Sequence, residues 1–224
     1  MVIAAAVVPH PPVLVPDVAR GLAPDLDALR GACTTAIDRL YAAEADELVV
    51  VGGGPKQSTN VARFGGFHEY GLDLAVDGRW ATAEDAEPMT LPFQIAAWLL
   101  RDRPDTPVRR AVMVDADGGL AMGDAKRRAL LVLGDGSACR SVQAPGHFDE
   151  RAEAYDAEVA RALATADIKA LAGLDPELSR QLQVAGLPAW RALAAVSEGE
   201  YDAELLYDEA PYGVGYFVAS WITR

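Results

Sequence analysis

Short, uninterrupted apolar runs alternate along the chain with longer stretches in which apolar residues recur every three or four positions. An apolar run bounded by prolines, such as residues 2–8, is typical of a strand covered on both faces, and the three- to four-residue period predicts amphipathic helices. We expect strands at residues 2–8, 48–51, 111–114, 129–133, 205–207 and 214–221. We expect helices at residues 24–43, 90–100, 148–166, 175–184 and 188–196.

The order of these elements predicts an α/β fold. The chain opens with a strand, a helix and a second strand that runs into glycines, and this order favours a right-handed parallel unit. Residues 56–89 are rich in Gly, Asn, Asp and Thr and are the hardest to place, although Leu72, Leu74 and Val76 alternate as in an added strand or hairpin. With no linker or repeat, residues 1–224 are expected to form one domain, a mostly parallel central sheet flanked by helices.

Composition and charge narrow the function classes. Hydrophobic residues make up 51% of the chain and charged residues 24%, as in folded globular proteins. The 33 acidic residues exceed the 20 Lys and Arg residues, and a formal net charge of −13 disfavours nucleic acid and anionic membrane surfaces as partners. Two cysteines, Cys33 and Cys139, match no disulfide framework or zinc motif. With no signal-peptide pattern and no apolar run long enough to span a bilayer, we expect a cytoplasmic protein.

Polar residues follow four of the predicted strands. In open α/β sheets ligands gather outside the carboxyl ends of the strands. The segments that directly follow the strands, here called exits, are therefore the best candidates for a site. The exits hold His10, the glycine-rich residues 52–57, the pair Asp115 and Asp117, and the pair Asp135 and Ser137; His68 and His147 lie in loops just downstream of two of them. The glycine-rich exit matches neither the P-loop nor the dinucleotide-binding pattern, so a phosphate cradle is not expected there.

Two segments resemble a known family. The first is Pro9-His10-Pro11-Pro12 with Val15-Pro16, and the second is Gly134-Asp135-Gly136-Ser137 followed by Ala144-Pro145-Gly146, Phe148 and Tyr155-Asp156-Ala157-Glu158. Together they resemble the iron-binding subunit of the class III extradiol ring-cleavage dioxygenases. The resemblance covers both halves of the chain and implies the fold of that family, with an Fe(II) centre in which His10 is a ligand.

The chain departs from the family pattern at other positions. The resemblance implies a second histidine ligand after the second strand, but residues 52–57 contain none, and Ala138 stands where the family has an acid/base histidine. Glu204 and Glu209 lie in the region of the family's late glutamate ligand without a matching motif. Oxygen chemistry at non-haem iron requires two imidazoles and a carboxylate on one face of the metal.

The candidate site residues follow from these matches and departures. His10 and His68 are the candidate metal ligands, with His68 as a substitute for the missing histidine and Asp135 or Asp117 as a source of the carboxylate. Asp135 and His147 are the candidate catalytic residues. Each has a structural alternative, because a histidine between prolines can cap a strand and Asp and Ser readily close turns.

Three functions stay open at this point. The first is a metal-dependent oxidoreductase with an incomplete ligand set for Fe(II) or another divalent metal. The second is a catalytically inactive family member that binds a protein partner or a small molecule, with aromatic molecules among the candidates. The third is a hydrolase that uses Asp135, Ser137 and His147. A homodimer is a further expectation, because Tyr212, Tyr216, Phe217 and Trp221 could line an interface, although ordinary core is the simpler interpretation of these aromatic residues.

Overall fold

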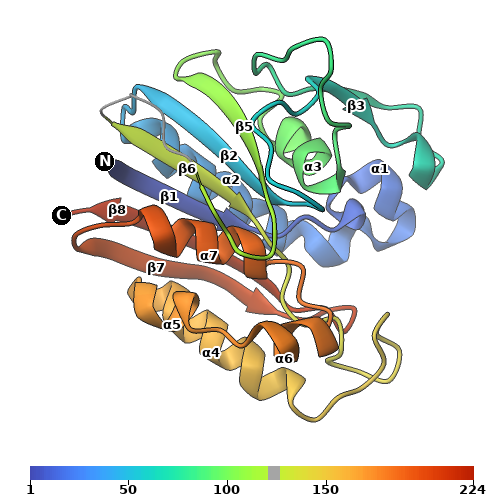
Figure 1. The fold of residues 1–224 in the computed structure, drawn as a ribbon. Helices are drawn as coiled ribbons and strands as arrows, with labels where there is room; N and C mark the ends of the chain where they lie inside the picture. Colours follow the sequence, from blue (N-terminus) through green and yellow to red (C-terminus); the bar gives the residue numbers. More distant parts are fainter. Residues whose placement is uncertain (121–126) are drawn as a thin grey trace.

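A six-stranded mixed sheet forms the centre of the protein in the computed structural model, which describes residues 1–120 and 127–224 (Figure 1). The strands lie in the order β5-β2-β6-β1-β8-β7. Their bounds are β1 Val2–Val8, β2 Glu47–Gly53, β5 Val108–Val114, β6 Arg128–Leu133, β7 Tyr201–Glu209 and β8 Tyr216–Thr223. The expected α/β fold with a mostly parallel sheet and flanking helices is confirmed.

Four neighbouring strands, β5, β2, β6 and β1, run parallel. Every residue of β1 and β6 is buried, which explains the apolar runs at residues 2–8 and 129–133. The chain does not fill the sheet in sequence order, because β6 lies between β1 and β2. As a result the last residues of β1 and β6, Val8 and Leu133, are direct neighbours at the carboxyl edge.

The closing strands β7 and β8 form an antiparallel pair that extends the sheet beside β1. Both were expected from the sequence, but β7 is longer than the apolar residues 205–207. Most side chains of β7 are exposed or partly exposed, as usual for an edge strand, so its polar ends carry no continuous apolar signal.

Helices cover both faces of the sheet (Figure 1). One face packs against α2 Asp27–Ala42 and α3 Leu91–Leu99, and the other against α4 Ala152–Thr165, α5 Ile168–Ala172 and α7 Leu187–Val196. The short elements are η1 Pro12–Leu14, α1 Pro16–Ala19, η2 Arg20–Leu26, η3 His68–Tyr70 and α6 Pro176–Gln181. No helix of the described residues is long and apolar enough to cross a membrane.

Two helices begin later than their apolar period predicts. Residues 24–26 belong to the 3-10 helix η2, and α2 starts at Asp27. Before α4, the Asp149 carboxylate accepts the Arg151 backbone N–H at 2.9 Å. This local hydrogen bond closes a non-helical turn, so α4 begins at Ala152. The short helix α5 was not expected; Asp167 caps it by accepting the Ala170 N–H.

The segment 56–89 contains a two-stranded hairpin, β3 Phe64–Gly66 with β4 Ala75–Asp77, which lies apart from the main sheet over α3 (Figure 1). The alternating residues Leu72 to Val76 therefore overlap a strand but begin before it. After the hairpin, Trp80 makes an isolated bridge to Arg109 of β5 and buries its ring, with Nε1 donating to the Val61 carbonyl. The segment thus covers one edge of the sheet.

Candidate functional site

The sheet brings His10 and Asp135 together. Because β1 and β6 are neighbours, the residues that follow them meet at the carboxyl edge, and Gly134 continues the ladder by donating its N–H to the Val8 carbonyl at 3.0 Å. The His10 backbone N–H then donates to Asp135 Oδ1 at 2.7 Å, and His10 Nδ1 lies 3.6 Å from the same oxygen. Two residues 125 positions apart form one polar pair.

Both side chains of this pair are largely buried. His10 is 7% exposed, and its Nδ1 has no hydrogen-bond partner among the described residues. Burial raises the pKa of the Asp135 carboxyl, and the nearby His10 side chain and backbone N–H partly oppose that rise. The carboxyl group therefore resists ionisation more than an aspartate in water does.

The Gly-Asp-Gly-Ser turn that carries Asp135 is held by contacts from three elements. Gly186, ahead of α7, donates its N–H to the Asp135 carbonyl at 2.8 Å, and Gly136 donates its N–H to the carbonyl of Gly215, ahead of β8, at 2.7 Å. A Cβ on Gly136 would lie 2.7 Å from the Phe217 ring and 2.8 Å from the Asp156 carboxylate. Only glycine allows the turn to approach its neighbours this closely.

Asp156 of α4 fastens the same turn from the helix side. Its carboxylate is buried, with Oδ1 accepting the Ser137 backbone N–H at 2.8 Å and Oδ2 accepting from Arg140 at 3.0 Å. Burial raises the pKa of Asp156, and the hydrogen bonds from Ser137 and Arg140 oppose the rise. Asp156 thus positions Asp135 through the turn, without a hydrogen bond to the Asp135 side chain.

Ser137 has a structural role in this arrangement. The side chain is fully buried, its hydroxyl donates to the Leu182 carbonyl at 3.2 Å, and it accepts the Cys139 N–H at 3.0 Å. Both interactions join the turn to the backbone around it. His147, the proposed hydrolytic partner, lies on the exposed loop after Ala144 with φ +60° and makes a backbone hydrogen bond there.

Asp135 faces a cavity of about 340 Å³. The rest of its wall is almost entirely apolar or aromatic: Pro11, Pro12, Val13, Leu22, Pro145, Tyr212, Val214 and Tyr216. These residues come from the segment after β1, from η2, from the loop after β6, and from the turn before β8 together with its first residue. His10 is not part of the wall, although its backbone N–H bonds to Asp135. Asp135 is the one carboxylate among the described residues of the wall.

Two tyrosines contribute the other polar side-chain atoms of the wall. Tyr216 is buried, and both burial and the charge of Asp135 raise the pKa of its hydroxyl. Among the described residues, no group accepts a hydrogen bond from the Tyr216 hydroxyl. The Tyr212 hydroxyl, by contrast, donates to Asp25 Oδ2 at 3.4 Å. Tyr216 is therefore the available donor beside Asp135.

The remaining candidates lie elsewhere. His68, in the turn of the β3–β4 hairpin, has a side chain that is 67% exposed and lies 3.7 Å from Asp73. Asp115 and Asp117 follow β5 and close a turn of their own, with the Asp117 N–H donating to the Asp115 carboxylate. Because β2 separates β5 from β6, they lie two strand spacings, about 10 Å, from the strand that carries Asp135.

The glutamates of the closing strand are engaged on the surface. Glu204 pairs with Arg39 of α2 at 2.7 Å, and Glu209 accepts from the Tyr207 hydroxyl at 3.2 Å. After β2, a Cβ on Gly54 would collide with the Met113 side chain and one on Gly53 would touch Pro188. The glycines of this exit let neighbouring segments pack on the strand end, in place of a ligand.

A metal centre of the kind implied by the resemblance does not fit these side chains. Within residues 1–120 and 127–224, no three His, Cys, Asp or Glu side chains cluster closely enough to hold a metal ion. His10 and Asp135 supply one imidazole and one carboxylate, and a facial iron site needs a second imidazole. His68 does not join them in a cluster.

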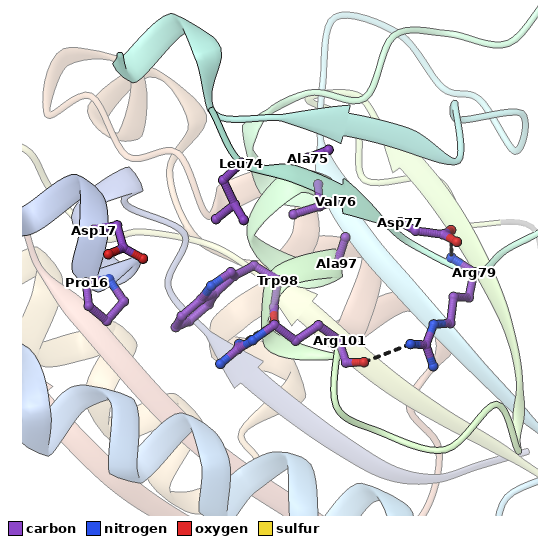
Figure 2. Close-up of a pocket in the computed structure, with 10 residues that line it drawn as sticks. All are labelled: Pro16, Asp17, Leu74, Ala75, Val76, Asp77, Arg79, Ala97, Trp98 and Arg101. Carbon is purple, nitrogen blue, oxygen red and sulfur yellow. Dashed lines mark hydrogen bonds between the residues drawn. The ribbon is translucent and has the colours of Figure 1, made fainter. Parts of the chain in front are cut away.

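A second cavity, of about 370 Å³, lies between α1, β4 and α3 (Figure 2). Its cationic side chains are already engaged. Arg79 donates to the Arg101 carbonyl at 2.9 Å and pairs with Asp105, and the Arg101 guanidinium stacks on the Trp98 ring at 4.3 Å. These contacts join the hairpin region to the end of α3, so the two arginines have structural roles. The candidate site is therefore the cavity at Asp135.

Sequence reasoning found the polar pair and missed the wall around it. The sequence indicates only interface or core roles for Tyr212 and Tyr216, and no local motif marks them as cavity residues. Tyr216, Phe217 and Trp221 are buried within the chain, in agreement with the core interpretation. The one available signal was the Pro-Tyr-Gly turn before β8, which returns the chain to the carboxyl edge of β1.

Comparison with other proteins adds no second line of evidence for the site. The chain matches no family model, and it matches no curated protein. The assignment of a function therefore depends on the geometry of His10, Asp135 and the cavity wall.

Proposed function

We propose that the protein binds a small, neutral and mainly apolar molecule, aromatic molecules included, in the cavity at the carboxyl ends of β1 and β6. The single observation that supports this most is the placement of one buried carboxylate, Asp135, in an otherwise apolar wall. Binding pockets for small molecules combine such a wall with a few polar groups that orient the ligand.

The charge of the site selects the ligand. An ionised Asp135 accepts hydrogen bonds and repels anions, and the net charge of −13 adds a long-range field of the same sign. A ligand with a hydroxyl group on an apolar body matches the one carboxylate and the apolar remainder of the wall. A phenol of the size of 4-ethylphenol is a suitable probe.

The resemblance to the extradiol dioxygenases supports a common evolutionary origin for this site. Its two matching segments, around His10 and around Asp135, are the ones that meet at the cavity. We propose that the chain is a relative of that family's iron-binding subunit that kept the pocket for a small molecule without the complete iron ligand set. This corresponds to the binding-module alternative among the three expected functions.

Titration calorimetry with three probes tests the proposal. We expect 4-ethylphenol to bind more tightly than 4-ethylanisole, which lacks the hydroxyl donor, and 4-ethylbenzoate to bind least because of its charge. Val214→Trp, in the wall, should weaken binding at least about 10-fold by filling the cavity. Val142→Trp, on the exposed loop after β6, is the matched control and should bind as the wild type does.

Two results would overturn the proposal. One is equal binding of the phenol to the wild type and to Val214→Trp. The other is near-stoichiometric iron, zinc, manganese or copper in anaerobically purified protein that disappears in His10→Ala, since this outcome would restore the metal-dependent oxidoreductase as the function.

A further inference from the structure

The cavity wall holds two polar groups of opposite hydrogen-bonding character. Asp135 is an acceptor when ionised, and the Tyr216 hydroxyl is a donor with no partner among the described residues. The other wall residues are prolines, aliphatic residues and Tyr212, whose hydroxyl already donates to Asp25. A bound molecule would therefore meet one base and one donor.

A base and a donor in an apolar space are what proton removal next to a carbonyl group requires. The base takes the proton from the α-carbon, and the donor stabilises the negative charge that develops on the carbonyl oxygen. Weak solvation makes the carboxylate a stronger base than it is in water, and it also strengthens the hydrogen bond to the oxygen.

The surroundings hold the base in place and keep the donor protonated. The His10 backbone N–H fixes Asp135 Oδ1 at 2.7 Å, and the turn that carries Asp135 is fastened by Gly186 and by Asp156. Burial and the Asp135 charge raise the pKa of Tyr216, which keeps its hydroxyl protonated at neutral pH. His10 and Asp156 act here as positioning residues.

We propose that this cavity enolises small neutral ketones that carry an apolar or aromatic group, with Asp135 as the base and Tyr216 as the donor to the carbonyl oxygen. The proposal deepens the proposed function and depends on it, because the ketone must first occupy the same cavity.

The reaction balances without a cofactor. The α C–H bond breaks and its proton moves to the Asp135 carboxylate, while its electron pair forms the C=C bond. The carbonyl π pair moves to oxygen, and the Tyr216 hydroxyl keeps its proton and donates a hydrogen bond to the enolate oxygen. Solvent then exchanges the proton held on Asp135. The product is the enolate, nothing is oxidised or reduced, and the reverse reaction in D₂O places deuterium on the α-carbon.

Proton exchange of 2-tetralone in D₂O, followed by ¹H NMR at its C1 position, tests the proposal. We expect the wild type to accelerate exchange over buffer. Asp135→Asn should reduce the enzyme-dependent rate by about 100-fold or more, the loss expected for a general base. Tyr216→Phe should reduce it by about 100-fold, as for an oxyanion donor. Tyr207→Phe is the control, because its hydroxyl bonds to Glu209 outside the wall, and it should exchange as the wild type does.

Binding of 2-tetralone, measured beside exchange by saturation-transfer NMR, separates the two proposals. Binding without accelerated exchange would overturn the enolisation and leave the binding function intact. Absence of binding by 2-tetralone and by 4-ethylphenol would overturn both. Exchange that persists at the wild-type rate in Asp135→Asn or Tyr216→Phe, with folding checked by circular dichroism, would also overturn the enolisation.

Discussion

The Asp135 carboxylate opposes folding at neutral pH. Its pKa is raised in the folded protein, chiefly by burial, so the unfolded chain ionises first as the pH rises. Wherever the folded state holds the proton more tightly, stability falls with rising pH, from the ordinary aspartate pKa near 3.8 up to the raised value. A carboxyl group that opposes folding and faces a cavity fits a functional role better than a structural one.

Asp135→Asn should therefore stabilise the protein at pH 7. The amide oxygen can still accept the His10 N–H, and the buried charge is gone, so we expect a gain of about 1 kcal/mol, equal to roughly 2–4 °C in Tm for a chain of this size. Thermal unfolding measures the gain, which should shrink as the pH falls toward the ordinary aspartate pKa. Asp73→Asn, at a fully exposed side chain, is the control and should change Tm by less than Asp135→Asn does. A lower Tm for Asp135→Asn at pH 7 would contradict this account.

At the residue scale, the sequence predicted half of the site. His10 and Asp135 stand in local motifs directly after apolar strands, where position alone indicates a ligand edge. Tyr216 stands inside an apolar strand of its own, and only the pairing of β8 with β1 brings it to the same cavity. His68 and His147 are loop histidines whose surroundings depend on how the loops fold, which a single sequence does not reveal.

At the scale of elements, the turn after β6 is a tightly packed junction. Gly134 lies against Gly186 and Trp190, and Gly136 lies between Phe217 of β8 and Asp156 of α4. The junction joins the parallel strands, the closing hairpin and the helices of one face. Close packing of this kind leaves no room for a methyl group.

Gly136→Ala should destabilise the protein by about 1–3 kcal/mol, because the new Cβ would force Phe217 or Asp156 to move. Urea unfolding measures the loss. Gly31→Ala is the matched control: Gly31 is exposed in α2, and its Cβ would meet nothing within 4 Å. That change should stabilise the protein by about 0.5–1 kcal/mol through helix propensity. Equal effects of the two changes would argue against tight packing at the turn.

At the scale of the whole molecule, excess negative charge acts against the compact state. The formal net charge is −13 at pH 7, and repulsion between like charges grows when the chain folds. Many of the ion pairs among the described residues join two exposed side chains, for example Arg180 with Glu177 and Arg224 with Glu200. Each such pair contributes little to stability.

Added salt should therefore raise Tm. Raising NaCl from about 20 mM to about 200 mM shortens the screening length to below about 10 Å and weakens the long-range repulsion more than the short-range pairs. We expect Tm at pH 7 to rise by a few degrees, measured by calorimetry. The same titration with KCl controls for specific ion effects, and a Tm that falls with both salts would mean that the surface ion pairs outweigh the repulsion.

The sequence by itself determined the fold class of this protein and the strands and main helices of its central layers. Apolar runs indicate the buried strands, and the three- to four-residue period indicates the amphipathic helices. Both patterns can be seen in the sequence because each buried position favours an apolar side chain. The strand ends also marked His10 and Asp135 as candidates. Only the tertiary structure decided that β6 lies beside β1, so that these residues meet, and that Tyr216 joins them around an apolar cavity. Strand order and cavity shape arise from contacts between distant segments, and no local pattern encodes them.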